Sequence, residues 1–219
     1  MRILILFCLI GCSTVTHAQD EFQLWTEVGA KGDIIKKMDW FVDVKSRFGN
    51  VGLNSLLPEA GINYKVTKWF KPSVSYRLIL EPNKYGNYKA AHRINFNANL
   101  KKGVKRFELG LRARYQYVVS GRGGQEYDSD FDQAIRVKPS IEYDINNSIF
   151  TPKVSTEFYY DPIFGPEGRR FTKIRFAIGS SLELDGPHSF SFKYQIDKWL
   201  HDYSRGLRHV LSVSYGYKF

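Results

Sequence analysis

The residues of this chain best suited to chemistry are seven arginines that recur on one face of alternating segments. A guanidinium group presents a rigid fork of donors that suits carboxylate and phosphate groups. If the arginines share an enclosed lumen, its wall would favour anions. The candidates are Arg47, Arg77, Arg93, Arg112, Arg114, Arg136 and Arg175.

Carboxylates recur on the same face and offer a second interpretation. Pairs between these acids and the arginines would fill a narrow lumen and serve the structure alone. The acidic candidates are Asp43, Glu59, Glu108, Glu142, Glu157 and Glu183. We therefore carry forward both an anion path and a side-chain network.

Other chemistries have weaker support. His201-Asp202 lies near Ser204, which leaves a hydrolase open, but the chain has no G-x-S-x-G pattern and we expect no enzyme. Asp128, Asp130 and related acids alternate in the longest loop. They could bind Ca²⁺, yet a solvated acidic loop accounts for them as well. H-E-x-x-H and paired-cysteine motifs are missing, so we expect neither metal nor cofactor.

The elements that must position these residues are β-strands. In residues 106–119 apolar and polar side chains alternate strictly, which separates two faces in a strand and would mix them in a helix. Ten further segments show the pattern: 22–30, 40–48, 56–66, 70–80, 93–100, 133–144, 149–160, 173–183, 187–197 and 208–219.

Alternation alone leaves open whether the apolar face points into a core or out into lipid. The polar face is heavily charged, as a hydrated lumen would be, and aromatic residues, 16% of the chain, gather near segment ends. The last strand ends at Phe219 and resembles the signal read by the outer-membrane barrel assembly machinery. We predict an outer-membrane barrel; a periplasmic barrel with an apolar core is the alternative.

The connections between segments predict an orientation and a strand number. Those near Thr67, residues 101–103, Asn146 and Gly186 are short, and those between them are long, as periplasmic turns and outer loops are. Bacterial single-chain barrels have even strand numbers, and residues 39–219 supply ten strands. Residues 22–30 are then a plug-like extra segment or one of twelve strands. The prediction is an all-β, antiparallel transmembrane β-barrel of 10–12 strands.

The N-terminus predicts export. Residues 1–18 have the Arg2, apolar run and small residues of a cleaved signal peptide, which leaves residues 19–219 as one barrel domain. A lipobox that would lipidate Cys12 competes with this interpretation. Cleavage after Ala18 removes both cysteines and lowers the net charge from +10 to +9. We expect no nucleic-acid partner, because an exported chain without a binding module is a poor candidate.

Several short motifs resemble an uncharacterised family of bacterial outer-membrane proteins, the domain of unknown function 2490. They are Leu24-Trp25-Thr26-Glu27, Arg47-Phe48, Glu59-Ala60-Gly61-Ile62-Asn63-Tyr64, Tyr76-Arg77, His92-Arg93 and the run from Leu111 to Tyr117. The resemblance covers almost all of residues 19–219. It implies a barrel and the outer membrane, and it carries no known activity.

Two functional classes follow. The barrel is a narrow pore for small anionic solutes, or it is a non-conducting structural or interaction protein with a filled lumen and functional outer loops. Its expected partners are outer-membrane lipid, the barrel assembly machinery acting through the strand that ends at Phe219, and a small anionic solute.

Overall fold

The computed structural model of the chain describes residues 20–82, 87–121, 128–163, 168–202 and 205–219. In these residues no helix is long and apolar enough to cross a membrane. The described residues form eleven strands: β1 (Glu21–Ile35), β2 (Met38–Gly49), β3 (Gly52–Tyr64), β4 (Phe70–Pro82), β5 (Tyr88–Val104), β6 (Phe107–Ser120), β7 (Ala134–Tyr143), β8 (Phe150–Asp161), β9 (Arg170–Glu183), β10 (His188–Trp199) and β11 (Arg208–Lys218).

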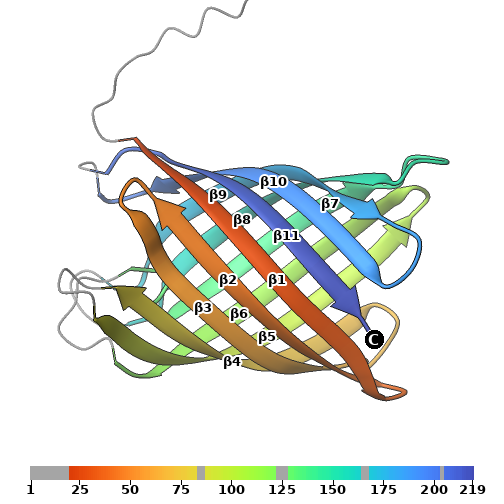
Figure 1. Cartoon of the computed structure of the whole chain (residues 1–219), viewed down its shortest axis with the longest axis horizontal. Coiled ribbons are helices and arrows are strands. Elements are labelled where there is room, and N and C mark those ends of the chain that lie inside the picture. The colour runs from red at the N-terminus through yellow and green to blue at the C-terminus, as the bar shows by residue number, and fades with distance from the viewer. Residues whose placement is uncertain (1–19, 83–86, 122–127, 164–167, 203–204) are drawn as a thin grey trace, which may run out of the picture.

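The strands close into one barrel in sequence order (Figure 1). Consecutive strands pair antiparallel, as strands joined directly by turns and loops do. The prediction of an all-β, antiparallel barrel of 10–12 strands is confirmed, but the even number is wrong. Residues 22–30 are neither a plug nor one of twelve strands. They belong to β1, which pairs parallel with β11 from Glu21↔Arg208 to Lys31↔Lys218 and closes the wall.

The two mouths of the barrel differ. Strands β4, β6, β8 and β10 end at one mouth, which we call the long-loop mouth, and strands β3, β5, β7 and β9 end at the other, the short-turn mouth (Figure 1). One predicted turn is displaced, since β5 continues through residues 101–103 and turns at Lys105. Because β1 and β11 are parallel, Glu21 lies at the long-loop mouth and Lys218 at the short-turn mouth.

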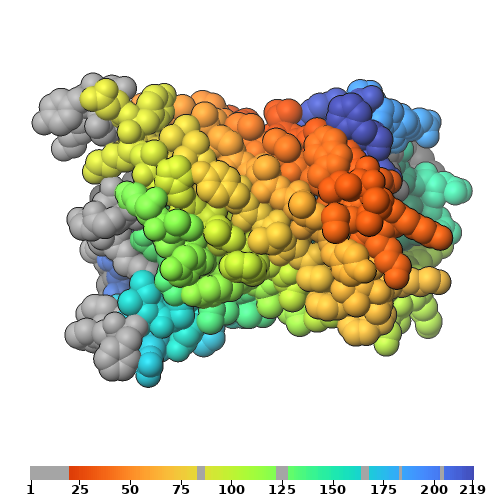
Figure 2. All heavy atoms as spheres, turned by 90° about the horizontal axis from the view of Figure 1, so that it is seen from below, coloured from red at the N-terminus to blue at the C-terminus, as the bar shows by residue number. Residues whose placement is uncertain are grey.

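Burial in this barrel is inverted relative to a soluble protein. Among the described residues, 22 polar or charged residues are buried and only nine hydrophobic ones. Large apolar side chains point outward from every strand, and Figure 2 shows the side chains of one face covering the wall as a continuous layer. The interior is therefore polar, and the alternative of an apolar core is wrong.

The alternation explains this arrangement directly. Val42 and Val44 of β2 are exposed, while Arg47 on the other face is buried. The faces of a strand alternate with period two, so one register places every charge of this strand inside.

Candidate functional site

The middle of the lumen holds a cavity of about 180 Å³ with a strongly charged lining. Nine lysines and arginines and four carboxylates border it. The cations are Lys45, Arg47, Arg77, Arg112, Arg114, Arg136, Lys138, Arg175 and Lys193, and the acids are Glu27, Asp43, Glu59 and Glu157. Positive charge is therefore in excess around this space.

Ion pairs across neighbouring strands neutralise part of that charge. Glu157 accepts hydrogen bonds from Arg136 at 2.9 and 2.8 Å and from Arg112 at 2.6 Å. Glu59 pairs with Arg77, and Lys45 Nζ lies 2.5 Å from a carboxylate oxygen of Glu27 on the adjacent strand. These pairs join β1 to β2, β3 to β4, and β7 to β8.

Three cations of the cavity lack such a partner. Within the described parts of the chain, no carboxylate oxygen lies within 4.0 Å of Arg114, Lys138 or Lys193. Arg114 instead donates through Nε to the side-chain oxygen of Asn97 at 2.5 Å. The geometry thus leaves cationic donors available to an anion in the lumen, because an ammonium or guanidinium group away from bulk water favours a counter-charge.

Toward the long-loop mouth a short segment between β6 and β7 folds into the lumen. Its Asp130 is 1% exposed and lies among four cations. Oδ2 is 2.7 Å from Lys173 Nζ, 3.2 Å from Arg208 Nη1 and 3.7 Å from Arg47 Nη1, and Oδ1 is 3.2 Å from Arg175 Nη2. Burial alone would raise the pKa of Asp130, but these cations hold it well below its ordinary value. The carboxylate is thus ionised within the barrel.

The rest of this segment, Asp128–Gln133, is anchored as well. Gln116 donates to the carbonyl oxygens of Ser129 at 3.3 Å and Asp132 at 2.9 Å. The Phe131 ring is buried in an apolar cluster with residues of β3, β4 and β5, namely Leu57, Ile79 and Ala91. The segment thus contacts the wall on several sides and occupies the lumen near the long-loop mouth.

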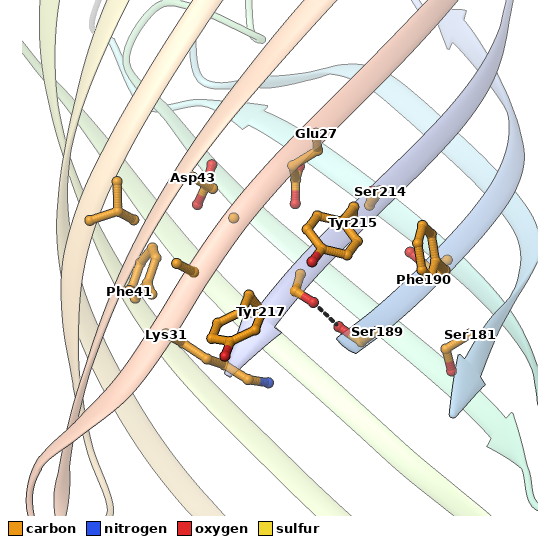
Figure 3. A pocket seen from close by; sticks show the side chains of 15 residues that line it. Glu27, Lys31, Phe41, Asp43, Ser181, Ser189, Phe190, Ser214, Tyr215 and Tyr217 are labelled. Atoms are coloured by element: carbon orange, nitrogen blue, oxygen red, sulfur yellow. Dashed lines mark hydrogen bonds between the residues drawn. The ribbon is translucent and has the colours of Figure 1, made fainter. Parts of the chain in front are cut away.

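A second cavity lies toward the short-turn mouth. This cavity of about 320 Å³ shares Glu27 and Asp43 with the central one, and small residues of β1, β9, β10 and β11 form much of its wall (Figure 3). Here Gly29 of β1 stands opposite Gly216 of β11, and Ser189 donates to the Gly216 carbonyl at 3.3 Å. The lumen is therefore hollow from this side and occupied on the other.

The comparison with known families now places the chain. Residues 22–198 match a family described as protein of unknown function (DUF2490). The chain belongs to this family. The resemblance drawn from the motifs is confirmed, and a search of curated proteins found no relative that matches. The DUF2490 match covers β1 to most of β10 and so contains every residue that lines the central cavity.

Most of the residues expected to be charged and inward line the lumen of this DUF2490 barrel. Arg47, Arg77, Arg112, Arg114, Arg136, Arg175, Asp43, Glu59 and Glu157 border the central cavity. Arg93 is fully buried and donates to the carbonyl oxygen of Asp130 at 2.7 Å. The cavity thus brings together members of both predicted sets from seven strands, β2 to β9 without β5.

The remaining acids lie elsewhere. Glu108 pairs with Lys101 near the short-turn mouth, where its side chain is 42% exposed, and Glu142 pairs with Lys153. The side chain of Glu183 lies outside the described part of the structure, as do Ser204 and residues 1–18 with the predicted signal peptide. Asp202 of the hydrolase candidate forms an ion pair with Arg205 at 2.8 Å.

Sequence reasoning missed several charged residues of the lumen. Lys138, Lys193 and Glu27 share the parity of the predicted inward faces, and that signal would have found them. No such signal marks Asp130, because it lies in an acidic loop that the sequence analysis interpreted as solvated. For Asp130 that interpretation is wrong, since the structure buries its side chain in the lumen. No cluster of potential metal ligands occurs among the described residues.

Proposed function

We propose that this barrel is an integral outer-membrane protein that binds small anions in its lumen and passes them through a narrow path. The observation that carries the proposal is the excess of cations around the central cavity, with three of them lacking a nearby carboxylate in the part of the chain that the structure describes. Rings of basic side chains in a pore favour anions electrostatically.

The outer surface supports membrane insertion. Valine, leucine, isoleucine and phenylalanine side chains point out from all strands, as contact with hydrocarbon requires. Aromatic residues gather near the strand ends, among them Trp40, whose ring centroid lies 5.8 Å from that of Phe219. Such amphipathic rings favour the interface between lipid and water.

Tyrosine–histidine pairs add to this belt. The hydroxyl of Tyr76 lies 2.5 Å from Nδ1 of His92, and that of Tyr194 lies 2.6 Å from Nδ1 of His209. Both pairs join adjacent strands on the outward face. Each pair provides a partner for the tyrosine hydroxyl and for one ring nitrogen of the histidine, which lowers the cost of placing these rings near lipid headgroups.

A second function, the non-conducting barrel, also has a specific observation in its favour. The Asp128–Gln133 segment and the buried side chains around it occupy the lumen near the long-loop mouth. If that segment never moves, the hollow half of the lumen would be a closed vestibule. The two functions therefore differ in whether ions cross.

Planar-bilayer conductance measurements on residues 19–219 distinguish the anion-conducting barrel from the non-conducting one. We expect discrete conductance steps and a reversal potential under a salt gradient that indicates preference for chloride. In Lys138→Gln/Lys193→Gln that preference should fall, because both side chains border the cavity without a carboxylate within 4.0 Å among the described residues.

The matched control is Lys36→Gln/Lys68→Gln, which removes the same charge from exposed turns at the short-turn mouth. Its selectivity should stay close to the parent value, especially at high salt. A well-folded barrel without any conductance would refute the pore and favour the structural function.

A further inference from the structure

The surroundings of Asp130 are those of an anion site that already holds an anion. Four cationic side chains lie within 4.0 Å of one carboxylate, and Arg93 binds the carbonyl oxygen of the same residue. These groups come from β2, β5, β9 and β11, so the barrel itself builds the site. The carboxylate that occupies the site belongs to Asp130, which lies in the connection between β6 and β7.

The site has more donors than Asp130 uses. Arg93 is fully buried, yet its Nε and Nη2 have no hydrogen-bond partner among the described residues, and the same is true of Nε of Arg47, which is 5% exposed. Buried donors without a partner cost free energy and are uncommon. A carboxylate offers two oxygens, so it cannot satisfy this set.

The cations of the site differ in whether a carboxylate other than Asp130 lies nearby. Arg175 also pairs with Asp197, and Arg208 also pairs with Glu21. For Arg47, however, Asp130 is the one carboxylate within 4.0 Å in the described residues. Without Asp130 the site would be left with uncompensated charge, which is costly in a buried position.

We propose that Arg47, Arg93, Lys173, Arg175 and Arg208 form an oxyanion-binding site in the lumen, and that Asp130 is a tethered occupant that an incoming phosphate group displaces. This rests on the proposed anion path and names its solute class. A phosphate group carries up to two charges and more acceptor oxygens than a carboxylate, and it matches arginine forks.

Displacement would also explain how solute passes the long-loop mouth. The Asp128–Gln133 segment occupies the lumen there, and the Asp130 carboxylate is its charged anchor. When an oxyanion takes the place of this carboxylate, the segment loses that charged anchor. The Phe131 contact, the hydrogen bonds from Gln116 and Arg93 and the hydrogen bond from Gln133 to Tyr115 do not depend on the carboxylate. Solute and segment thus compete for one set of cations.

The test is binding of inorganic phosphate to residues 19–219 in detergent, measured by titration calorimetry at pH 7.5. In Asp130→Asn the tethered anion is gone, and we expect the apparent Kd for phosphate to fall at least tenfold, because a competitor lowers the binding-competent fraction. Phe131→Ala keeps every charge and loosens the segment, so it should lower Kd in the same direction by less.

The matched control is Asp39→Asn. Asp39 is also a buried carboxylate between two lysines, Lys65 and Lys71, but it lies at the short-turn mouth. Its phosphate affinity should equal that of the parent. Equal affinity in Asp130→Asn and in the parent would overturn the inference.

Conductance measurements distinguish a failure of the proposed oxyanion site from a failure of the proposed anion path. If the parent barrel conducts anions and Asp130→Asn binds phosphate no better, the site is wrong and the anion path stands. If Asp130→Asn binds phosphate tightly while both proteins are non-conducting, the site stands and the pore is wrong.

Discussion

The carboxylate of Glu157 on β8 accepts two hydrogen bonds from the guanidinium of Arg136 on β7, at 2.9 and 2.8 Å. Both side chains are almost completely buried. This bidentate pair couples two neighbouring strands inside the lumen. Arg112 on β6 binds the same carboxylate, so three consecutive strands share one acid.

Removing that acid should destabilise the barrel. In Glu157→Gln two arginines lose their carboxylate, and breaking a buried pair costs about 3–5 kcal/mol. Urea unfolding in lipid vesicles, followed by tryptophan fluorescence, measures the loss. Glu108→Gln is the control, since its pair with Lys101 is half exposed and is expected to contribute about 1 kcal/mol or less. Similar losses in the two variants would contradict the expected role of Glu157.

Ion selectivity should depend on the arginines of β6. Arg112→Gln/Arg114→Gln removes two cations from the cavity wall, and we expect the reversal potential to move toward cation preference. Lys36→Gln/Lys68→Gln again supplies the control of equal charge change. An unchanged reversal potential in a conducting double variant would exclude these two arginines from the ion path.

Stability should fall in acid because of Asp130. The pKa of Asp130 is held well below its ordinary value in the folded barrel, so its contribution is complete above the unfolded-state pKa of about 3.9. Below that pH the unfolded state binds the proton first, and the contribution declines as pH falls toward the folded pKa. The difference in unfolding free energy between the parent and Asp130→Asn should therefore be constant from pH 5 to 8 and shrink below about pH 4. A difference that is independent of pH down to 3 would count against the ionised carboxylate.

The β9–β10 wall should not tolerate a side chain at Gly179. A Cβ there would lie 2.2 Å from the Phe192 carbonyl oxygen and 2.7 Å from Lys193 Cα, and both are backbone atoms that cannot turn aside. We expect Gly179→Ala to lose about 1–3 kcal/mol or more and to refold in lower yield, seen as less heat-modifiable protein on unheated gels. Gly103→Ala, where nothing lies within 4 Å of the new Cβ, should refold like the parent. Equal yields would show that the strands can separate to accept the methyl group.

The strands and their faces could be predicted from sequence because a strand alternates with an exact period of two. That period places Arg112 and Arg114 on one face and Leu111 and Ala113 on the other, whatever the rest of the fold does. The alternation does not give the position of a residue along the barrel axis. The partners of Glu157 therefore needed the registers of β6, β7 and β8.

Two features could not be predicted. The parallel pairing of β1 with β11 joins residues almost 190 positions apart, and alternation carries no information on which edge strands meet. The inward position of Asp130 depends on cations from four strands, while its own neighbours, Ser129 and Asp128, are equally typical of a solvated loop.

The parallel pairing of β1 with β11 also places the start of the first strand and the end of the last strand at opposite mouths of the barrel. Since β1 starts at one rim and β11 finishes at the other, an epitope placed ahead of Glu21 and another placed behind Phe219 would be displayed at opposite mouths of the barrel. For the same reason a short peptide cannot join the two ends, so a circular permutant would need a linker as long as the wall is high.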